Sequence, residues 1–251
     1  MNSIFDLSDK VALITGASTG LGAAIAIGFA DGGADLVLVD RSGSPETSEK
    51  IRALGRKVLT LKADLSSISP IGMIIEKTIK EFGKIDILVN NAGTIRRTPS
   101  IDFSEKDWDD VMALNAKTVF FLSQAAAKDM MKRKSGKIIN IASLLSFQGG
   151  ILVPSYAASK GAVAQMTKAL ANEWARHGIT VNAIAPGYME TNNTKVLRED
   201  PLRAKAIVDR IPAGRWGQPK DLIGAAVFLA SSASDYVNGH VLVVDGGWMG
   251  R

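Results

Sequence analysis

The sequence predicts an α/β fold in which helices cover both faces of one parallel, seven-stranded sheet. Short apolar runs rich in β-branched residues recur along the 251-residue chain, and longer stretches with helical spacing of apolar residues separate them. No linker rich in Pro, Gly or Ser interrupts this alternation, and no segment repeats. Because strands that alternate with helices form doubly wound parallel sheets, we expect a single domain over residues 1–251.

Seven segments fit the strands of this sheet, since each is short, apolar and separated from the next by a helical pattern. They are residues 11–15, 36–39, 58–61, 85–89, 137–142, 180–184 and 241–244. The longest stretch without a strand runs from Pro186 to about Asn238, and residues 191–209 within it are polar with a helical pattern. We expect there either a substrate lid, at about residues 187–215, or an ordinary pair of surface helices.

Composition argues against several classes of protein. With 46% hydrophobic residues the chain can bury a large core, and it has no 18-residue apolar run that could span a membrane. The absence of cysteine excludes disulfides and thiolate metal sites, and two histidines leave little for a zinc cluster, although an all-carboxylate site stays open. The net charge of +5 comes from dispersed basic residues, which favours a solvated surface over nucleic-acid binding. The first ten residues contain Asp6 and Asp9 rather than a basic and then apolar leader, so we expect a cytoplasmic protein.

A glycine-rich turn follows the first predicted strand and leads into an alanine-rich helix. The turn comprises Thr15, Gly16, Ala17, Ser18, Thr19, Gly20, Leu21 and Gly22. This order of strand, turn and helix is typical of a dinucleotide site, because pyrophosphate must approach bare backbone at a helix N-terminus. The glycines could instead only shape a turn, but Asp40 ends the second strand about 20 residues on, where a carboxylate accepts hydrogen bonds from the adenosine ribose. The sequence therefore predicts a Rossmann-like fold that binds NAD.

Polar or glycine residues also stand at the carboxyl ends of the later strands. They are Asp64, the run Asn90-Asn91-Ala92-Gly93, Ser143 and the pair Pro186-Gly187. Ligands of open α/β sheets bind in the crevice at these strand ends, so the separate positions indicate one site. Either Asn90 or Asn91 could instead only tie neighbouring strands together.

Tyr156 and Lys160 lie four residues apart on a helix that opens at Pro154, so their side chains share one face. A phenol has a pKa of about 10 and is a poor base near neutral pH, but an adjacent ammonium lowers that pKa. Lys160 is placed to be this cation. Ser143 can donate a hydrogen bond to a substrate oxygen while Tyr156 exchanges its proton. A nicotinamide would carry the hydride, because no side chain can supply one.

On these motifs the chain resembles the classical short-chain dehydrogenases/reductases over essentially its whole length. The family's TGxxxGxG matches Thr15 to Gly22, its NNAG matches Asn90 to Gly93, its catalytic serine matches Ser143 and its YxxxK matches Tyr156 to Lys160.

Further site residues follow from this resemblance. It implies that Asn115 is a fourth catalytic residue, in a helix kink that holds a water connected to Lys160. It also implies that Asp64 and Leu65 lie at the adenine and that Lys160 holds the nicotinamide ribose. The family's PGxxxT, which grips the carboxamide, matches Pro186, Gly187 and Thr191.

Longer stretches resemble one group within the family, the 2-dehydro-3-deoxy-D-gluconate 5-dehydrogenases, also called 2-deoxy-D-gluconate 3-dehydrogenases. These stretches are residues 90–97, 103–112, 142–150, 186–194 and 210–217. The resemblance implies NAD-linked interconversion of a hydroxyl and a ketone on a sugar acid, in bacterial pectin and uronate breakdown, by a homotetramer. The helix around residues 157–174 is apolar on more than one face, which suits either a subunit interface or tight packing within one chain.

Two alternatives stay open within the family, gluconate 5-dehydrogenase and 3-oxoacyl carrier-protein reductase. The latter would use NADPH and would need a basic docking patch. Asp40 argues against the use of NADPH, and the dispersed charge argues against such a patch. Outside the enzymes, a nicotinamide-sensing regulatory protein is the alternative, but it would not need Asn115, Ser143, Tyr156 and Lys160 together.

A carboxylate on the substrate would need cationic partners near the crevice. Arg96 and Arg97 begin a loop just beyond the fourth strand, where paired guanidinium groups could bind it, or both could be solvated or contact another subunit. Residues that could contact the rest of a polyol chain lie in flanking segments and are Gln148, Tyr188, Asn192, Asn193 and Trp216. Arg41, directly after Asp40, could bind a 2′-phosphate and soften the preference for NAD.

Overall fold

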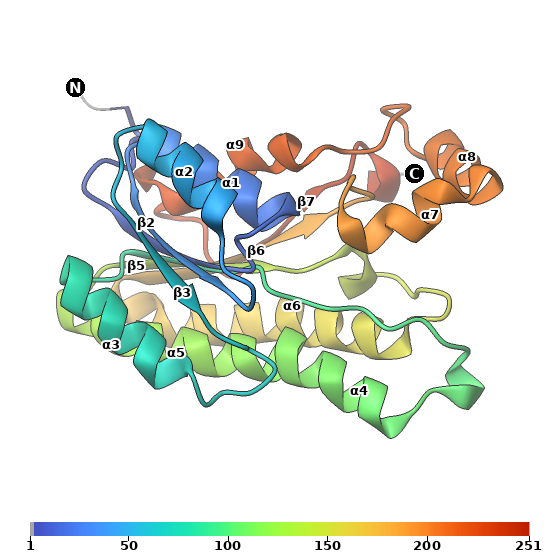
Figure 1. The fold of residues 1–251 in the computed structure, drawn as a ribbon, viewed down its shortest axis with the longest axis horizontal. Helices are drawn as coiled ribbons and strands as arrows, with labels where there is room; N and C mark the ends of the chain where they lie inside the picture. Colours follow the sequence, from blue (N-terminus) through green and yellow to red (C-terminus); the bar gives the residue numbers. More distant parts are fainter. Residues whose placement is uncertain (1–2, 251) are drawn as a thin grey trace.

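The computed structural model describes residues 3–250, and helices flank its parallel sheet on both faces (Figure 1). The seven strands run in the order β3-β2-β1-β4-β5-β6-β7. They are β1 (Val11–Thr15), β2 (Asp35–Asp40), β3 (Val58–Lys62), β4 (Ile87–Asn90), β5 (Gly136–Ile141), β6 (Ile179–Pro186) and β7 (Val241–Val244). The order changes direction between β1 and β4, and this switch point is where open α/β sheets bind ligands.

The predicted fold class and all seven predicted strands are confirmed. The first and last strands have the predicted bounds, and the others differ by one or two residues at their ends. The fourth strand begins two residues later than predicted, and Asp86, just before it, uses its side chain to hold neighbouring segments. Its carboxylate accepts a hydrogen bond from the Val11 backbone at 2.9 Å and pairs with Lys84 and Arg133.

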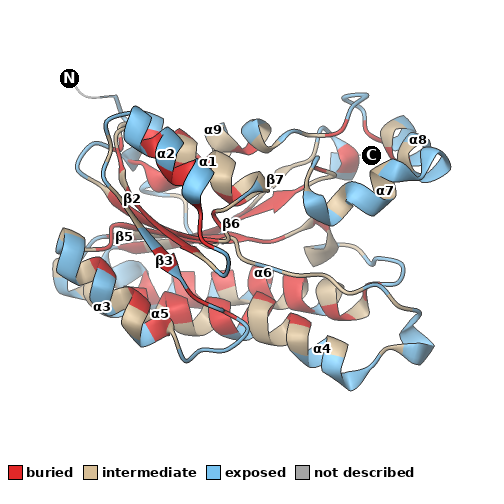
Figure 2. Cartoon of the chain, in the orientation of Figure 1, coloured by how far each residue is buried: buried red, intermediate tan, exposed pale blue. Residues whose placement is uncertain are grey.

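Alternate side chains of the strands point into two apolar layers. In β1, Ala12 and Ile14 pack in the layer beneath α1 (Gly20–Asp31), α2 (Pro45–Ala53) and α9 (Ile223–Ala230). Val11 and Leu13 pack in the opposite layer, beneath α3 (Ile71–Phe82), α5 (Thr118–Arg133) and α6 (Pro154–Trp174). Figure 2 shows the buried residues concentrated in the sheet and on the helix faces turned toward it.

Two further features shape the carboxyl end of the sheet. The helix α4 (Glu105–Met112) joins α5 through a π-helical turn, Ala113–Lys117. The segment predicted to be helical after β6 forms two short helices, α7 (Lys195–Glu199) and α8 (Pro201–Arg210), which lie at one end of the molecule in Figure 1.

Between residues 3 and 250, no helix is long and apolar enough to cross a membrane. Over the same range, no group of three or more His, Cys, Asp or Glu side chains is placed to hold a metal ion.

Candidate active site

Two cavities open at the carboxyl ends of the strands. The first has a volume of about 300 Å³ and is lined by the glycine turn, Asp40 and the residues that follow β4, β5 and β6. The second, of about 470 Å³, extends from the ends of β5 and β6 to α8 and Trp248. Residues that line both are Ser143, Tyr156, Pro186, Gly187, Asn193 and Thr194. The predicted hydroxyl pair, Ser143 and Tyr156, therefore lies where the two cavities meet.

The glycine turn exposes bare backbone to the first cavity. Gly16 and Gly20 have left-handed φ angles of +65° and +59°, which side-chain-bearing residues rarely adopt. A Cβ on Gly22 would stand 2.2 Å from the Gly16 carbonyl oxygen, so α1 could not pack this closely on the turn with any other residue. The Thr19 side chain makes no capping hydrogen bond to α1, which leaves the first backbone N–H groups of the helix without a side-chain cap. The turn can thus accept a phosphate group.

Asp40 lies at the end of β2 and lines the first cavity. Its carboxylate accepts hydrogen bonds from the Ser18 hydroxyl at 2.8 Å and from the backbone and hydroxyl of Ser42 at 3.0 and 2.8 Å. Burial raises the pKa of Asp40, but these hydrogen bonds outweigh it and hold the pKa below its ordinary value. Asp40 is therefore ionised at neutral pH.

The two adjacent asparagines have different surroundings. Asn90 is buried and donates to Ser123 at 2.9 Å and to Asn140 at 2.8 Å, so it ties β4 to α5 and β5. Asn91 lines the first cavity and donates to the carbonyl oxygens of Thr15 and Gly16, both at 2.9 Å. The strand-tying role left open in the sequence is clearest for Asn90, whereas Asn91 combines it with a place in the cavity wall.

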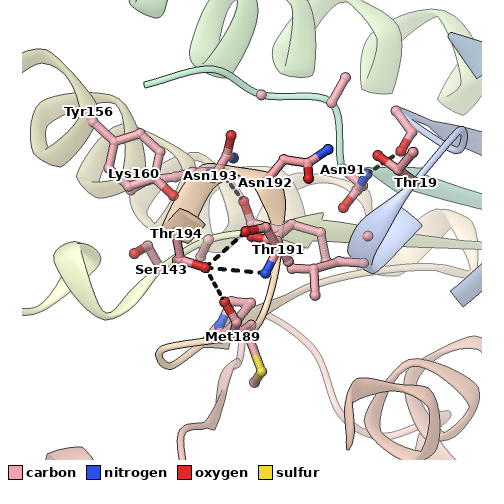
Figure 3. A pocket seen from close by; sticks show the side chains of 18 of the residues that line it. Thr19, Asn91, Ser143, Tyr156, Lys160, Met189, Thr191, Asn192, Asn193 and Thr194 are labelled. Atoms are coloured by element: carbon pink, nitrogen blue, oxygen red, sulfur yellow. Dashed lines mark hydrogen bonds between the residues drawn. The ribbon is translucent and has the colours of Figure 1, made fainter. Parts of the chain in front are cut away.

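The other predicted cofactor contacts divide into two groups. Those in the first cavity wall are Gly16, Ser18, Thr19, Gly20, Leu21, Gly93, Pro186, Gly187 and Thr191. Gly22, Asp64, Leu65 and Asn90 do not line it. In Figure 3, Thr19 and Asn91 lie at one end of this cavity and Tyr156 and Lys160 at the other.

Tyr156 is half-buried on the first turns of α6, and its surroundings shift its pKa in the direction opposite to the predicted one. Burial raises the pKa of Tyr156, while the hydrogen bond with Ser143 and the positive charge of Arg97 act in the opposite direction without prevailing. The predicted lowering of this pKa by Lys160 is therefore wrong for this structure.

The position of Lys160 explains why this residue does not lower the pKa of Tyr156. Its Nζ atom lies 5.6 Å from the centre of the Tyr156 ring and donates to the Ile141 carbonyl oxygen at 2.5 Å. The side chain is buried, and this burial lowers the pKa of Lys160 to about 8. The ammonium is thus held near Tyr156 but bound to the end of β5.

Asn115 lies in the π-helical turn between α4 and α5, at the place where the resemblance implied a kink. Its amide donates to the Thr94 carbonyl at 2.9 Å and to the Ser159 hydroxyl at 3.1 Å, and its oxygen accepts from the Thr94 backbone at 2.9 Å. Ser159 in turn donates to the Tyr156 carbonyl. Asn115 therefore holds the loop after β4 against the first turns of α6, beside Lys160.

The residues predicted to contact substrate are not all in one place. Arg97, Gln148 and Tyr188 line the second cavity, Asn192 lines the first, and Asn193 lines both. Trp216 lines neither and packs edge-on against Tyr188, with ring centres 5.6 Å apart.

Arg96 lies outside both cavities. Its guanidinium is 3.2 Å from Asp107 and 3.6 Å from Asp110, carboxylates of α4. The structure thus separates the paired arginines, because adjacent side chains on an extended loop point in different directions.

The second cavity also contains functional candidates that sequence reasoning missed. Arg203 and Arg210 of α8 line it together with Trp248 near the C-terminus. The guanidinium of Arg210 lies 4.0 Å from the centre of the Trp248 ring. The seven-residue spacing of the two arginines was a helical signal, but nothing in the sequence showed which side of α8 faces the site.

The residues of the first cavity fit a nicotinamide dinucleotide. The turn supplies uncapped backbone N–H groups for a pyrophosphate, Asp40 supplies an ionised acceptor for ribose hydroxyls, and Tyr156 and Lys160 stand at the other end. The arrangement can bind a dinucleotide in one cavity and present a proton donor to a second molecule in the other.

A family model described as enoyl-(acyl carrier protein) reductase matches residues 16–249. The 2-dehydro-3-deoxy-D-gluconate 5-dehydrogenases of Dickeya dadantii and Escherichia coli are 63% and 60% identical to the chain, covering 98% and 99% of both sequences. A solved structure from Agrobacterium tumefaciens, described as a 2-deoxy-D-gluconate 3-dehydrogenase with bound NADP, is 53% identical, covers 100% of both chains and has a TM-score of 0.92.

Proposed function

The chain belongs to the short-chain dehydrogenase/reductase family, and from that premise we propose that it interconverts the C5 hydroxyl of 2-dehydro-3-deoxy-D-gluconate with the 5-ketone. The observation that carries this proposal is the place of Ser143 and Tyr156, which line both the dinucleotide cavity and the cavity beside it. The identity to sugar-acid dehydrogenases supports the substrate class.

A bound nicotinamide cofactor supplies or accepts the hydride. In ketone reduction Ser143 donates a hydrogen bond to the carbonyl oxygen, and Tyr156 donates the proton that this oxygen gains. The raised pKa of Tyr156 keeps the phenol protonated at neutral pH, which suits a proton donor. Lys160 places a positive charge near the phenol, and Asn115 fixes the start of α6.

We propose that Asp40 makes NAD the preferred cofactor, since an ionised carboxylate accepts hydrogen bonds from ribose hydroxyls and repels a 2′-phosphate. Arg41 is the competing feature, because its charge acts on nearby Asp64 and could also meet a 2′-phosphate. Asp64 and Leu65 are proposed to lie beyond the first cavity, at the adenine.

The substrate contacts that we propose are Ser143, Tyr156, Arg97, Gln148, Tyr188 and Asn192. Arg96 is not retained, because its ion pairs with Asp107 and Asp110 occupy its guanidinium outside the cavity. The chain is proposed to act as one domain in which residues 187–215, with α7 and α8, form a lid over the second cavity.

Assembly and cellular setting are further parts of the proposal. We propose a homotetramer, and the small residues Ala158 and Ala169, which are exposed on α6, and Ala162, which is half-buried, support close packing of this helix against another subunit. We also propose a cytoplasmic role in pectin breakdown, which the similarity to sugar-acid dehydrogenases supports.

The function is tested by following NADH absorbance with the purified protein and a panel of sugar acids. The 5-keto acid should be reduced faster than 5-ketogluconate or a 3-oxoacyl thioester. Tyr156→Phe should lower turnover by a factor of a thousand or so while NADH binding stays within about threefold, because the proton donor is lost but little cofactor contact. NADH binding without turnover of any member of the panel would instead indicate a nicotinamide-sensing protein.

A further inference from the structure

Among residues 3–250, the charged side chains that line the second cavity are all positive. They belong to Arg97, Arg203 and Arg210, and no Asp, Glu or Lys side chain of these residues is in the lining. For Arg203 and Arg210, no carboxylate of residues 3–250 lies within ion-pair distance. Arginines that line a cavity and have no ion-pair partner among residues 3–250 are suited to bind an anionic ligand.

One face of α8 is built toward this cavity. The lining residues from α8 are Arg203, Ala206, Ile207 and Arg210, spaced three, four and seven positions apart, as on one side of a helix. Ile207 is buried and anchors this face in the apolar cluster with Trp248. Lys205 lies on another side, where its ammonium pairs with Asp209 at 2.6 Å. The helix therefore presents Arg203 and Arg210, both solvent-exposed, to the cavity and pairs Lys205 on another side.

Arg210 is held by a preformed support. Its guanidinium stacks 4.0 Å from the centre of the Trp248 ring, and Trp248 is itself buried. The Trp248 indole packs 4.6 Å from the Tyr188 ring and donates to the Gln148 side chain at 3.4 Å. Stacking fixes the plane of the guanidinium while leaving its N–H groups free of the ring face.

The three arginines come from two parts of the cavity wall, since Arg97 lies in the loop after β4 and the other two belong to α8. Arg97 is the one whose charge acts on Tyr156, and it also donates to the Asn193 carbonyl at 2.8 Å. Arg203 and Arg210 belong to α8, which lies apart from α6, the helix that carries Tyr156, in Figure 1. In an acid oxidised at C5 the carboxylate is at the opposite end of the carbon chain from the reacting carbon. The cations suited to that carboxylate are those remote from Tyr156.

We propose that Arg203 and Arg210 of α8 form the carboxylate subsite of the second cavity, with Trp248 positioning Arg210. Arg97 then faces the hydroxyl groups near the reacting carbon. This assignment rests on the proposed function, because it takes the reacting carbon to be distant from the acid group. It makes α8 the element by which the enzyme selects an acid over a neutral sugar.

The test compares Arg203→Ala, Arg210→Ala, Arg210→Lys and the double alanine variant with wild type. Lys205→Ala is the matched control, since it removes a cation of the same helix that points away from the cavity. Oxidation of 2-dehydro-3-deoxy-D-gluconate is measured beside oxidation of the counterpart in which a hydroxymethyl group replaces the carboxylate. Each single alanine variant should lose about tenfold to a hundredfold in kcat/KM toward the acid, mostly through KM, and less than threefold toward the neutral compound. The kcat/KM of Arg210→Lys toward the acid should lie between those of wild type and Arg210→Ala, because lysine keeps the charge but not the planar guanidinium group.

Equal losses on the acid and the neutral compound, or a loss in Lys205→Ala as large as in Arg210→Ala, would overturn the assignment. A second readout does not depend on turnover. Sodium D-gluconate should raise the melting temperature of the NADH-bound wild type and have little effect on the NADH-bound double variant. If wild type oxidises no sugar acid while this difference persists, the proposed reaction fails and the anion subsite stands; if the shift persists in the double variant, the subsite fails.

Discussion

Lys160 and Tyr156 show how burial shifts the pKa of a side chain that ionises to a cation and of one that ionises to an anion. Burial disfavours the charged form of each, so it raises the pKa of the phenol and lowers that of the ammonium. The pair therefore differs from a simple phenolate stabilised by a lysine. Tyr156 remains protonated over a wide pH range, and Lys160, with its pKa of about 8, is the group that titrates near physiological pH.

The first prediction concerns pH. Because the pKa of Lys160 is lowered to about 8, the side chain is an ammonium below pH 8 and becomes neutral as the pH rises through it. We expect kcat/KM for NADH in ketone reduction to be level below pH 7 and to fall about tenfold per unit well above pH 8. The measurement is a profile from pH 6 to pH 10.

Lys160→Met is the control for this profile, since it removes the titrating group and retains a long apolar stem. It should be less active throughout and lack the fall near pH 8. The same fall in wild type and in Lys160→Met would assign the titration to another group.

The second prediction concerns Asp40. Asp40→Ala should lower kcat/KM for NAD by about 10- to 150-fold, the cost of losing hydrogen bonds to a charged acceptor, and should raise it for NADP. Asp35→Ala is the matched control, because Asp35 begins the same strand and pairs with Arg56 at 2.9 Å, away from the cavity. An unchanged ratio of the two cofactors in Asp40→Ala would show that Arg41 or another group sets the preference.

At the scale of elements, the sites depend on how helices begin. The helix α1 starts in a turn that only glycine permits, and α6 starts at Pro154, whose fixed φ suits a first helical position. The π-helical turn at Asn115 bends the backbone so that one amide side chain joins the loop after β4 to α6. The beginnings of α1 and α6, together with the π-helical turn, place the glycine turn, the Tyr156 phenol and the Lys160 ammonium around the first cavity.

The third prediction follows from the packing of α1. In Gly22→Ala the new Cβ would stand 2.2 Å from the Gly16 carbonyl oxygen and 2.4 Å from the Asn91 amide nitrogen. The turn must shift, so NADH affinity should fall at least tenfold and the protein should be destabilised by about 1–3 kcal/mol. Calorimetric titration with NADH and thermal unfolding measure the two effects.

Gly72→Ala on α3 is the control, because nothing lies within 4 Å of its added Cβ. It should bind NADH as wild type does and be equally or slightly more stable, since alanine favours a helix over glycine. NADH affinity in Gly22→Ala equal to that in Gly72→Ala would contradict the close-packing argument.

At the scale of the whole molecule, the sheet is the support for the sites rather than part of them. Its central strands are buried between two apolar layers, and only their carboxyl ends reach the cavities. A change in one layer away from these ends should therefore affect the free energy of unfolding more than catalysis.

The fourth prediction tests this separation with Ile74 of α3, which is fully buried in the layer shared with α5 and α6. Ile74→Ala should lower the free energy of unfolding by about 2–5 kcal/mol, through lost transfer energy and the cavity left behind. Urea unfolding measures this loss. In the folded protein kcat and KM should stay within about twofold, and a tenfold change in either would show that the layer is coupled to the site.

The sequence by itself determined the features whose signals are local in the chain. Strand runs, the glycine turn before α1 and the four-residue spacing of Tyr156 and Lys160 each follow from patterns within a few residues, because backbone geometry fixes periodicity and turn requirements locally. The fold class and the cavity position followed from them, since parallel strands carry their carboxyl ends to one edge.

Only the tertiary structure decided the properties that depend on which distant groups meet. It separated Arg97 from Arg96, whose partners Asp107 and Asp110 lie on α4, and it turned Arg203 and Arg210 toward the second cavity. It also reversed the expected pKa of Tyr156, because desolvation depends on everything packed around the phenol and not on the lysine four residues away. The direction and the burial of a side chain depend on contacts between distant parts of the chain, so they cannot be predicted from residue spacing along the sequence.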